Sequence, residues 1–527
     1  MPIAFAGVLA LGVMIGTKIS PFTTKPSLTN YHKENSRIDD IVNFISQRYV
    51  DSINVDSIMN AFVGDYLNDP ATIDEFFKKL DPHSSYIHKE DLQGFNEELE
   101  GNFDGVGIEF NIVDDTILVV AALSGGPSER LGIKAGDKII MINDSTVAGN
   151  GITSDGVMHK LRGKKGTEVN VKIQRKGESN LLAFKIIRDV IPVTSIDASY
   201  MIDDKTGYIK VNKFAEETPL EFDNALQTLI NSGMKNLILD LRGNPGGYLT
   251  GAVELADQFL GGTPLIVYTN GRSVGRTDYR AGKNGLFERG NLVVLINEYS
   301  ASAAEILAGA LQDNKRATII GRRSFGKGLV QQVFPLPDTS AIRLTIARYY
   351  TPSGKSIQRP YTDGVDAYYD QYVSIMMNGG ELPDSLKTDK NKNIDWGIHP
   401  DIHVSMDTSE LNKTLNYLMN RSLVQEFAYS TYSSNPKAFS GYKDVADFKN
   451  NYSVSDAMFS KFVSFAVAHD PEKGVTENEI IACRSKISIG IEALIARQVW
   501  GDTGYYTFMN QMDDAYLRAV QFIETGK

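Results

Sequence analysis

The sequence has almost no cysteine. Cys483 is the only cysteine among 527 residues, so no disulfide can form within the chain. A single cysteine is consistent with a reducing compartment or with an exported bacterial protein that folds without disulfides. Cys483 ends the apolar run Ile480–Cys483, and a small buried side chain is a better interpretation of it than a nucleophile.

Clusters of basic residues and metal-binding motifs are also missing. The chain has 54 Lys and Arg against 65 Asp and Glu, a net charge of -11, which argues against binding to nucleic acid. No His-Glu-x-x-His motif and no paired-cysteine motif occurs among its residues. None of its seven histidines stands in the context of a serine nucleophile, so we interpret them as structural or surface residues. The sequence therefore predicts no catalytic metal and no other cofactor.

Residues 1–20 hold an apolar segment that is short for a membrane span. Pro2–Gly16 is uncharged and about 15 residues long, which is the length of the apolar part of a signal peptide. No basic segment precedes it and no clear cleavage site follows. A cleaved export signal and a retained membrane anchor both stay open, with a buried core helix as the alternative. We expect the protein on the periplasmic side of a bacterial cell envelope, either free or anchored in the inner membrane.

The hydrophobic pattern changes four times along the chain, which predicts an α/β multidomain protein. Residues 37–98 have helical spacing, and residues 99–188 have short alternating stretches punctuated by glycine, which indicate a small β-rich domain. In residues 189–405, strands alternate with helices, and the continuous apolar strand Asn291–Ile296 indicates a sheet covered on both faces. Residues 408–527 form a helical C-terminal region.

Ser302 begins the predicted helix at residues 302–311. With Glu305 three residues later, it matches the capping box, in which a serine and a glutamate satisfy backbone N–H groups at a helix start. A hydroxyl in this position also lies where the helix dipole favours negative charge. The N–H group of Ala303 would then point at the oxyanion of a tetrahedral intermediate. Capping and nucleophilic catalysis require the same geometry, so both interpretations stay open here.

Lys327 follows Ser302 by 25 residues and stands between two glycines. A lysine near its ordinary pKa of ~10.4 is a poor base at neutral pH. Desolvation without a carboxylate partner would lower the pKa toward the working pH. No acid stands within five residues of Lys327. If the segment is extended, the side chain of Gln331 would lie on the same face as that of Lys327. The amide oxygen of Gln331 would then hold the amine of Lys327 in position.

Two alternatives for Lys327 need mention. An exposed lysine in a glycine turn is the simpler one. The other is a phosphate-binding loop, because Gly321–Lys327 matches G-x-x-x-x-G-K. That motif needs Ser or Thr next, to hold magnesium, but this chain has Gly328 followed by a predicted strand.

Two glycine motifs complete the set of candidate site residues. Gly246 and Gly247 follow the predicted strand Asn236–Asp240, and one of their N–H groups would be a second oxyanion donor, although an ordinary turn is the alternative. The loop Gly105-Val106-Gly107-Ile108 precedes an apolar strand. Its N–H groups would form a nest that captures a chain-terminal carboxylate.

Taken together, these segments resemble the carboxyl-terminal processing proteases, from about residue 38 to residue 404. The resemblance is carried by the following segments: Gly105–Ile108, Ala135–Asp137, Leu161–Gly163, Asp240–Gly247, Ser302–Ile306, Phe325–Gly328 with Gln331, and Gly397–Ile402. It implies a PDZ-like domain and a mixed-sheet α/β protease core of the crotonase-like or ClpP-like kind. It also implies Ser302 as nucleophile, Lys327 as general base, Gln331 as its orienting partner, and Ala303 and Gly246 as the oxyanion hole.

The resemblance further implies a serine endopeptidase that binds apolar C-terminal tails of exported proteins through its PDZ-like domain. Its partners would be polypeptides with a free C-terminus, with an adaptor or a second copy of the chain as further partners and no nucleic acid. A catalytically silent peptide-binding scaffold is the alternative, and an acyltransferase or thioesterase is a more distant one. The helical region after residue 408 lies outside the resemblance, so its role is open.

Overall fold

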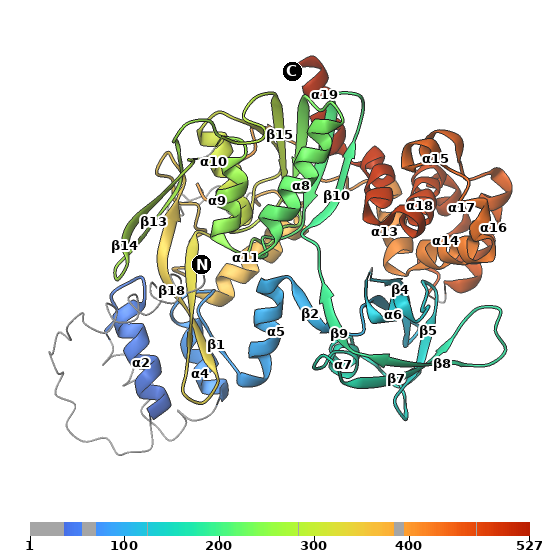
Figure 1. Cartoon of the computed structure of the whole chain (residues 1–527), viewed down its shortest axis with the longest axis horizontal. Coiled ribbons are helices and arrows are strands. Elements are labelled where there is room, and N and C mark those ends of the chain that lie inside the picture. Colours follow the sequence, from blue (N-terminus) through green and yellow to red (C-terminus); the bar gives the residue numbers. More distant parts are fainter. Residues whose placement is uncertain are drawn as a thin grey trace, which may run out of the picture.

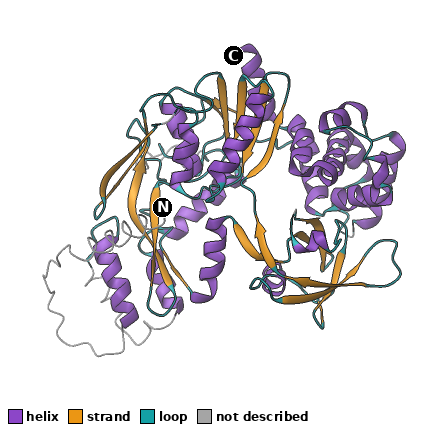
Figure 2. Ribbon diagram, viewed as in Figure 1, coloured by secondary structure: helices purple, strands orange, loops and turns teal. Residues whose placement is uncertain are grey.

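The computed structural model describes residues 36–54, 70–123, 125–282, 284–383, 395–470 and 472–526, which fold as an α/β protein of several domains (Figures 1 and 2). Within these ranges, every helix is too short or too polar to cross a bilayer. The predicted export segment at residues 1–20 lies outside the described residues, as does the second apolar stripe of the N-terminal region, near residues 58–67.

The N-terminal region packs directly on the α/β core. Its elements are α2 (Ser36–Arg48), α4 (Pro70–Lys78), β1 (Ser85–Ile87) and α5 (Lys89–Glu100). Helical spacing places Ile41 and Ile45 on one face of α2, where they pack with Phe77 in a cluster that includes Ile342 and Leu344 of the core. The helices were predicted, but the three-residue strand β1, which pairs with β18 (Ala341–Tyr350), was not.

Residues 102–192 form the β-rich domain expected to be PDZ-like and the two-stranded ribbon that joins it to the rest of the chain. The domain sheet has the order β3-β4-β5-β7-β8, so β3 is an edge strand, and β2 pairs with β9 in the ribbon. The elements are β2 (Asn102–Gly105), β3 (Ile108–Val113), β4 (Thr116–Ala122), α6 (Pro127–Arg130), β5 (Lys138–Ile142), β6 (Ser145–Thr146), α7 (Ser154–Leu161), β7 (Glu168–Gln174), β8 (Leu182–Ile187) and β9 (Asp189–Pro192).

The α/β core at residues 189–405 is built on a mixed sheet, as predicted. Its order is β10-β11-β12-β15-β16-β19, with β10 antiparallel to β11 and the other pairs parallel. The strands are β10 (Ile196–Met201), β11 (Thr206–Val211), β12 (Asn236–Asp240), β15 (Asn291–Ile296), β16 (Thr318–Gly321) and β19 (Ile402–His403). The helices on one face are α8 (Thr218–Asn231), α9 (Leu249–Asp257) and α10 (Ala303–Asp313).

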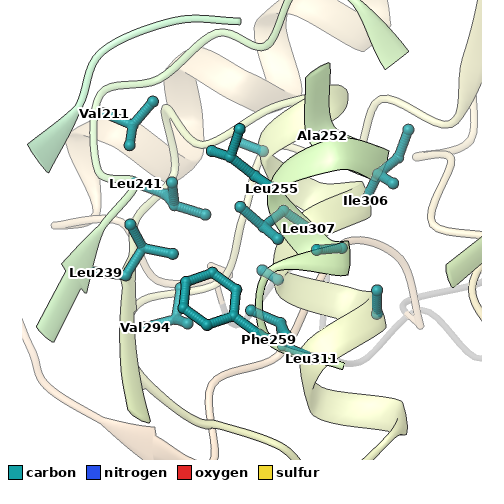
Figure 3. Packing of buried hydrophobic residues seen from close by; sticks show 14 of the residues in the cluster. Val211, Leu239, Leu241, Ala252, Leu255, Phe259, Val294, Ile306, Leu307 and Leu311 are labelled. Carbon is teal, nitrogen blue, oxygen red and sulfur yellow. The ribbon is translucent and has the colours of Figure 1, made fainter. Parts of the chain in front are cut away.

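Both faces of this sheet are buried, which explains why its strands are apolar without alternation. Leu239 and Val294 pack on one face against Leu255 and Leu307 of α9 and α10 (Figure 3). The strand residues next to these in the sequence, such as Ile238 and Val293, face the other side of the sheet. On that side α19 (Asp514–Thr525) contributes Tyr516 and Ala519.

A second sheet stands beside the first and carries the lysine segment. Its order is β1-β18-β13-β14, and β17 also pairs with β18. The remaining elements of this part are β13 (Leu265–Gly271), β14 (Gly275–Arg280), β17 (Leu329–Pro335) and α11 (Val365–Met377).

The C-terminal helical region contacts both the β-rich domain and the α/β core (Figure 1). Before α19 it contains α13 (Glu410–Asn420), α14 (Leu423–Ser434), α15 (Val445–Asn451), α16 (Asp456–His469), α17 (Glu477–Ala482) and α18 (Arg484–Met509). Arg497 of α18 donates two hydrogen bonds to Glu109 on β3, at 2.8 and 3.2 Å. Cys483 is buried, as predicted, and its Sγ donates to the backbone oxygen of Leu411.

Candidate active site

Ser302 lies at the turn between β15 and α10, and its backbone is strained. Its φ of 55° and ψ of -115° fall in a region that residues with a side chain rarely adopt. Such strain persists only where the surroundings hold it, and it is common at catalytic residues. The surroundings here include Glu305, whose Oε2 accepts a hydrogen bond from the Ser302 amide at 2.8 Å.

Glu305 joins the serine segment to the lysine segment. Its Oε2 also accepts from the amide of Lys327 at 2.9 Å, and its Oε1 accepts from the Ser324 hydroxyl at 2.6 Å and the Gly326 amide at 2.7 Å. The side chain is 1% exposed. This burial raises the pKa of Glu305 to about 7, and the four hydrogen bonds oppose the rise. A single carboxylate thus positions both predicted catalytic residues through their backbones.

Tyr349 of β18 makes a second link between the same two segments. Its buried hydroxyl lies 3.1 Å from the backbone oxygen of Ser302 and in hydrogen-bond contact with the backbone oxygen of Lys327. Because Glu305 binds the amides and Tyr349 binds the carbonyls, Ser302 and Lys327 are held side by side.

The amine of Lys327 lies in surroundings that favour its neutral form. Burial, and after it the positive charge of Arg343, lower the pKa of Lys327 to about 8, while Asp81 and Glu305 oppose the shift. In the described part of the chain the amine has no carboxylate oxygen within 4 Å. The sequence near Lys327 contains no acid, but the fold brings these two from distant segments.

Gln331 lies on β17 directly opposite Thr345 of β18, and its Nε2 donates to the Thr345 hydroxyl at 3.3 Å. The register shift at this point lies on β18, where Ile346 is the extra residue between Thr345 and Ala347, so β17 itself has no insertion. Lys327 precedes β17, which begins at Leu329, so the shared face of Lys327 and Gln331 stays a prediction.

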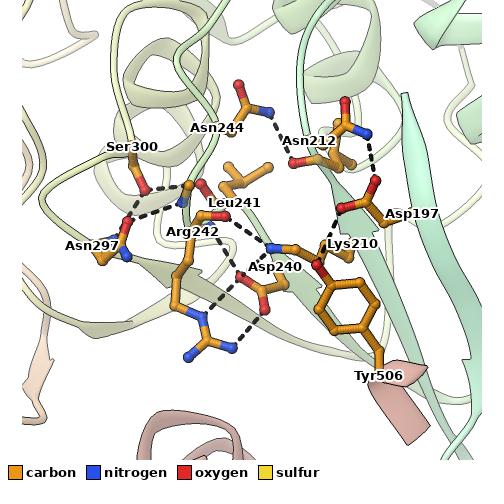
Figure 4. A network of polar contacts seen from close by, with 12 residues as sticks. Asp197, Lys210, Asn212, Asp240, Leu241, Arg242, Asn244, Asn297, Ser300 and Tyr506 are labelled. Atoms are coloured by element: carbon orange, nitrogen blue, oxygen red, sulfur yellow. Dashed lines mark hydrogen bonds and ion pairs between the residues drawn. The ribbon is translucent and has the colours of Figure 1, made fainter. Parts of the chain in front are cut away.

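The turn at residues 240–247 is fixed by a buried polar network (Figure 4). Arg242 donates to both carboxylate oxygens of Asp240, at 2.9 and 2.6 Å, and Lys210 donates to the backbone oxygen of Arg242. Burial alone would raise the pKa of Asp240, but the charges of Arg242 and Lys210 hold it below its ordinary value. Ser300 Oγ donates to the Leu241 carbonyl at 2.9 Å, which ties this turn to the serine segment.

The two predicted oxyanion donors, Ala303 and Gly246, differ in whether their N–H groups are already hydrogen-bonded. The amide of Ala303 has no acceptor in the described part of the chain. Gly246 abuts Ser302, since a Cβ on it would lie 2.7 Å from the Cβ of Ser302, but its N–H donates to Asn244 Oδ1 at 2.8 Å. The prediction for Gly246 therefore needs correction, because its donor is occupied. The N–H of Gly247 has no acceptor among the described residues.

Comparison with known proteins decides the family. The family model for peptidase family S41 matches residues 205–367, a PDZ domain model matches residues 105–186, and a family of unknown function, DUF8443, matches residues 414–501. The carboxy-terminal-processing protease of Bartonella bacilliformis is 38% identical over 338 residues, which are 62% of this chain and 74% of the relative. The carboxy-terminal processing protease CtpB of Bacillus subtilis is 33% identical over 329 residues, 62% of this chain and 66% of the relative.

This chain belongs to the carboxy-terminal processing protease family. It is a serine-type peptidase with a PDZ domain. Among solved structures it is similar to the photosystem II D1 C-terminal processing protease, with 25% identity, a TM-score of 0.41, and coverage of 69% of this chain and 92% of that one.

The predicted peptide-binding loop of this processing protease lies between β2 and β3. The amides of Val106 and Gly107 have no acceptor in the part of the chain that the structure describes, and Gly107 has a φ of +71°. The side chain of Val106 is buried in the domain core, so only its backbone faces a ligand, whereas Ile108 is partly exposed at the edge strand. The loop thus keeps free donors beside an unpaired strand edge.

Sequence reasoning missed three residues of the protease site. Tyr349 and Thr345 lie on β18, which carried no motif, and Asp81 lies in a turn of the N-terminal region. Glu305 was recognised only as a helix-capping residue. The signal for its wider role was limited to its place one turn after Ser302, since its contact with the lysine segment depends on the fold.

Proposed function

We propose that this carboxy-terminal processing protease cleaves polypeptides with a Ser302–Lys327 dyad. The observation that carries the proposal is the double link between the two segments, by the Glu305 carboxylate to their amides and by the Tyr349 hydroxyl to their carbonyls. The lowered pKa of Lys327, to about 8, supports a neutral amine as the base.

In the proposed reaction the Lys327 amine takes the proton of the Ser302 hydroxyl as Oγ bonds to the substrate carbonyl carbon. The carbonyl π electrons move to oxygen and give a tetrahedral oxyanion. When this intermediate collapses, the C–N bond breaks and the Lys327 ammonium returns its proton to the leaving amine. Water then adds to the acyl ester with Lys327 again as base, and the C–O bond to Ser302 breaks.

The oxyanion would be stabilised by the amides of Ala303 and Gly247. Both N–H groups lack an acceptor among the described residues, and Ala303 is the first residue of α10, where the helix dipole also favours negative charge. Gln331 would hold the Lys327 amine through its amide oxygen, since its NH2 group is engaged by Thr345.

The PDZ domain would recognise apolar C-terminal tails. The unpaired amides of Val106 and Gly107 suit a terminal carboxylate, and the free edge of β3 suits addition of an extended peptide as a further strand. We also propose that residues 1–20 direct the chain to the cell envelope, which fractionation of cells producing it with and without Pro2–Gly16 would test.

The test is cleavage of an unstructured protein such as casein by the wild type and by the Ser302→Ala and Lys327→Ala variants. We expect both substitutions to abolish cleavage and a chelator to have no effect on the wild type. Substantial cleavage by both variants would refute the dyad. The silent scaffold would be favoured if the wild type bound tail peptides without cleaving them. The protein without residues 99–188 would then also have to show no cleavage.

A further inference from the structure

Asp81 brings a buried carboxylate from the N-terminal region to the back of the proposed dyad. It lies in the turn between α4 and β1 and is 2% exposed. Its Oδ1 accepts from the amides of His83 and Ser84 at 2.8 and 2.9 Å, and its Oδ2 accepts from the Ser84 hydroxyl at 2.6 Å. These bonds fix the carboxylate in one orientation.

The same Oδ1 also accepts from the hydroxyl of Thr345 at 3.1 Å. Thr345 is fully buried on β18, and it lies opposite Gln331. A threonine hydroxyl has one proton, and a carboxylate oxygen only accepts, so the proton of Thr345 points to Asp81. The Thr345 oxygen is then left to accept from Gln331, whose Nε2 is 3.3 Å away.

We propose that Asp81 acts through Thr345 as a positioning residue that sets the amide of Gln331 with its oxygen, and not its NH2 group, toward the Lys327 amine. The proposal rests on the Ser302–Lys327 dyad as the catalytic apparatus. An amide oxygen accepts an N–H of a neutral amine and leaves the nitrogen lone pair free for Ser302. A flipped amide would donate to that lone pair and block the base.

The charged groups around Lys327 allow an effect on the orientation of the Gln331 amide to be distinguished from an effect on the pKa of Lys327. Arg343 lowers the pKa of Lys327, while Asp81 and Glu305 raise it, and burial keeps the neighbouring His83 neutral with a pKa of about 2. Asp81→Asn therefore changes both charge and hydrogen bonding. Thr345→Val removes the hydroxyl and leaves every one of these charges in place.

The experiment measures kcat and KM against pH for the wild type and for Thr345→Val, Thr345→Ser and Asp81→Asn, with thermal unfolding to show that each variant folds. We expect Thr345→Val to lower kcat about tenfold with KM changed less than about twofold, and Thr345→Ser to restore most of the rate. Asp81→Asn should lower kcat and also move the rising limb of the pH profile to lower pH.

The deciding comparison repeats Thr345→Val in a Gln331→Ala background. If Thr345 acts through Gln331, its substitution should cause no further loss there. An equal loss of kcat in both backgrounds would show a merely structural role and overturn the proposal, as would wild-type kcat in folded Thr345→Val. If those results came with inactive Ser302→Ala and Lys327→Ala, the dyad would stand and only the positioning role would fall.

Discussion

Glu305 accepts a hydrogen bond from the backbone amide of Lys327, 2.9 Å away, and makes no ion pair with the side-chain amine in the described structure. The carboxylate can therefore hold the lysine segment against the serine segment without fixing a proton on the amine. Its charge still opposes the lowering of the Lys327 pKa, but burial and Arg343 outweigh it.

The rate of cleavage should depend on the neutral form of Lys327. With a pKa of about 8, the neutral fraction falls about tenfold for each pH unit below that value. We therefore expect kcat/KM for a quenched fluorescent peptide to rise with pH and to level off above about pH 8.

Arg343→Gln gives a directional check on this profile. Arg343 lowers the pKa of Lys327, so its removal should raise that pKa and move the midpoint to higher pH. A flat profile in the wild type, or a midpoint that moves to lower pH in the variant, would contradict the assignment.

Glu305→Gln should slow kcat about tenfold or more while the protein stays folded. The amide is the same size, but its NH2 group cannot accept from one of the two pairs of donors that Glu305 binds. Steady-state kinetics, with circular dichroism as the folding check, measure the effect. Glu254→Gln, an exposed site on α9, is the matched control and should leave kcat unchanged; equal rates for both variants would exclude the linking role.

Gly246→Ala should lower activity about a hundredfold or more. A Cβ at this position would lie 2.7 Å from the Cβ of Ser302 and within 3 Å of Ala301 O and Ala303 N, so Ser302 must move. Gly243→Ala is a matched control in the same turn, because its φ is also positive but a Cβ there meets nothing within 4 Å. Peptide cleavage by the control should exceed that of Gly246→Ala by more than about tenfold.

Two strands of the core that are buried on both faces could be predicted to the residue. Asn236–Asp240 and Asn291–Ile296 read as continuous apolar runs because helices cover each side. The hairpin of β13 and β14 was missed, since most of Gly275–Arg280 is exposed and polar and carries no alternating pattern.

The candidate site divides in the same way. Ser302 and Lys327 stand in local motifs that the sequence displays, so the sequence could single them out as candidates. Asp81 and Tyr349 reach the site only because β1, β17 and β18 pair, and contacts made across a sheet leave no local pattern in the sequence. The same limit applies to Gly246, whose N–H is occupied by a side chain two residues away.

The C-terminal region should stabilise the turn beside Ser302. Asp513 binds Arg242 with both carboxylate oxygens at 2.7 Å, and it also caps α19 by accepting from the Tyr516 amide at 2.8 Å. Asp513→Ala removes both interactions and should reduce the free energy of unfolding by about 1–3 kcal/mol. Asp513→Asn keeps a capping oxygen, so its loss should be smaller.

Urea unfolding of the two Asp513 variants measures these differences. Wild-type stability in Asp513→Asn would show that the Arg242–Asp513 ion pair does not stabilise the turn, and a larger loss in Asp513→Asn than in Asp513→Ala would contradict the capping role.

The most direct test of the account is the rate at which a fluorophosphonate labels Ser302, measured from about pH 6 to about pH 10 in the wild type and in Lys327→Ala. We expect the wild-type rate to rise with a midpoint near pH 8 and the Lys327→Ala rate to be at least about a hundredfold lower. Equal labelling of the two proteins, or a wild-type midpoint near the ordinary lysine value of ~10.4, would contradict the claim that a neutral Lys327 activates Ser302.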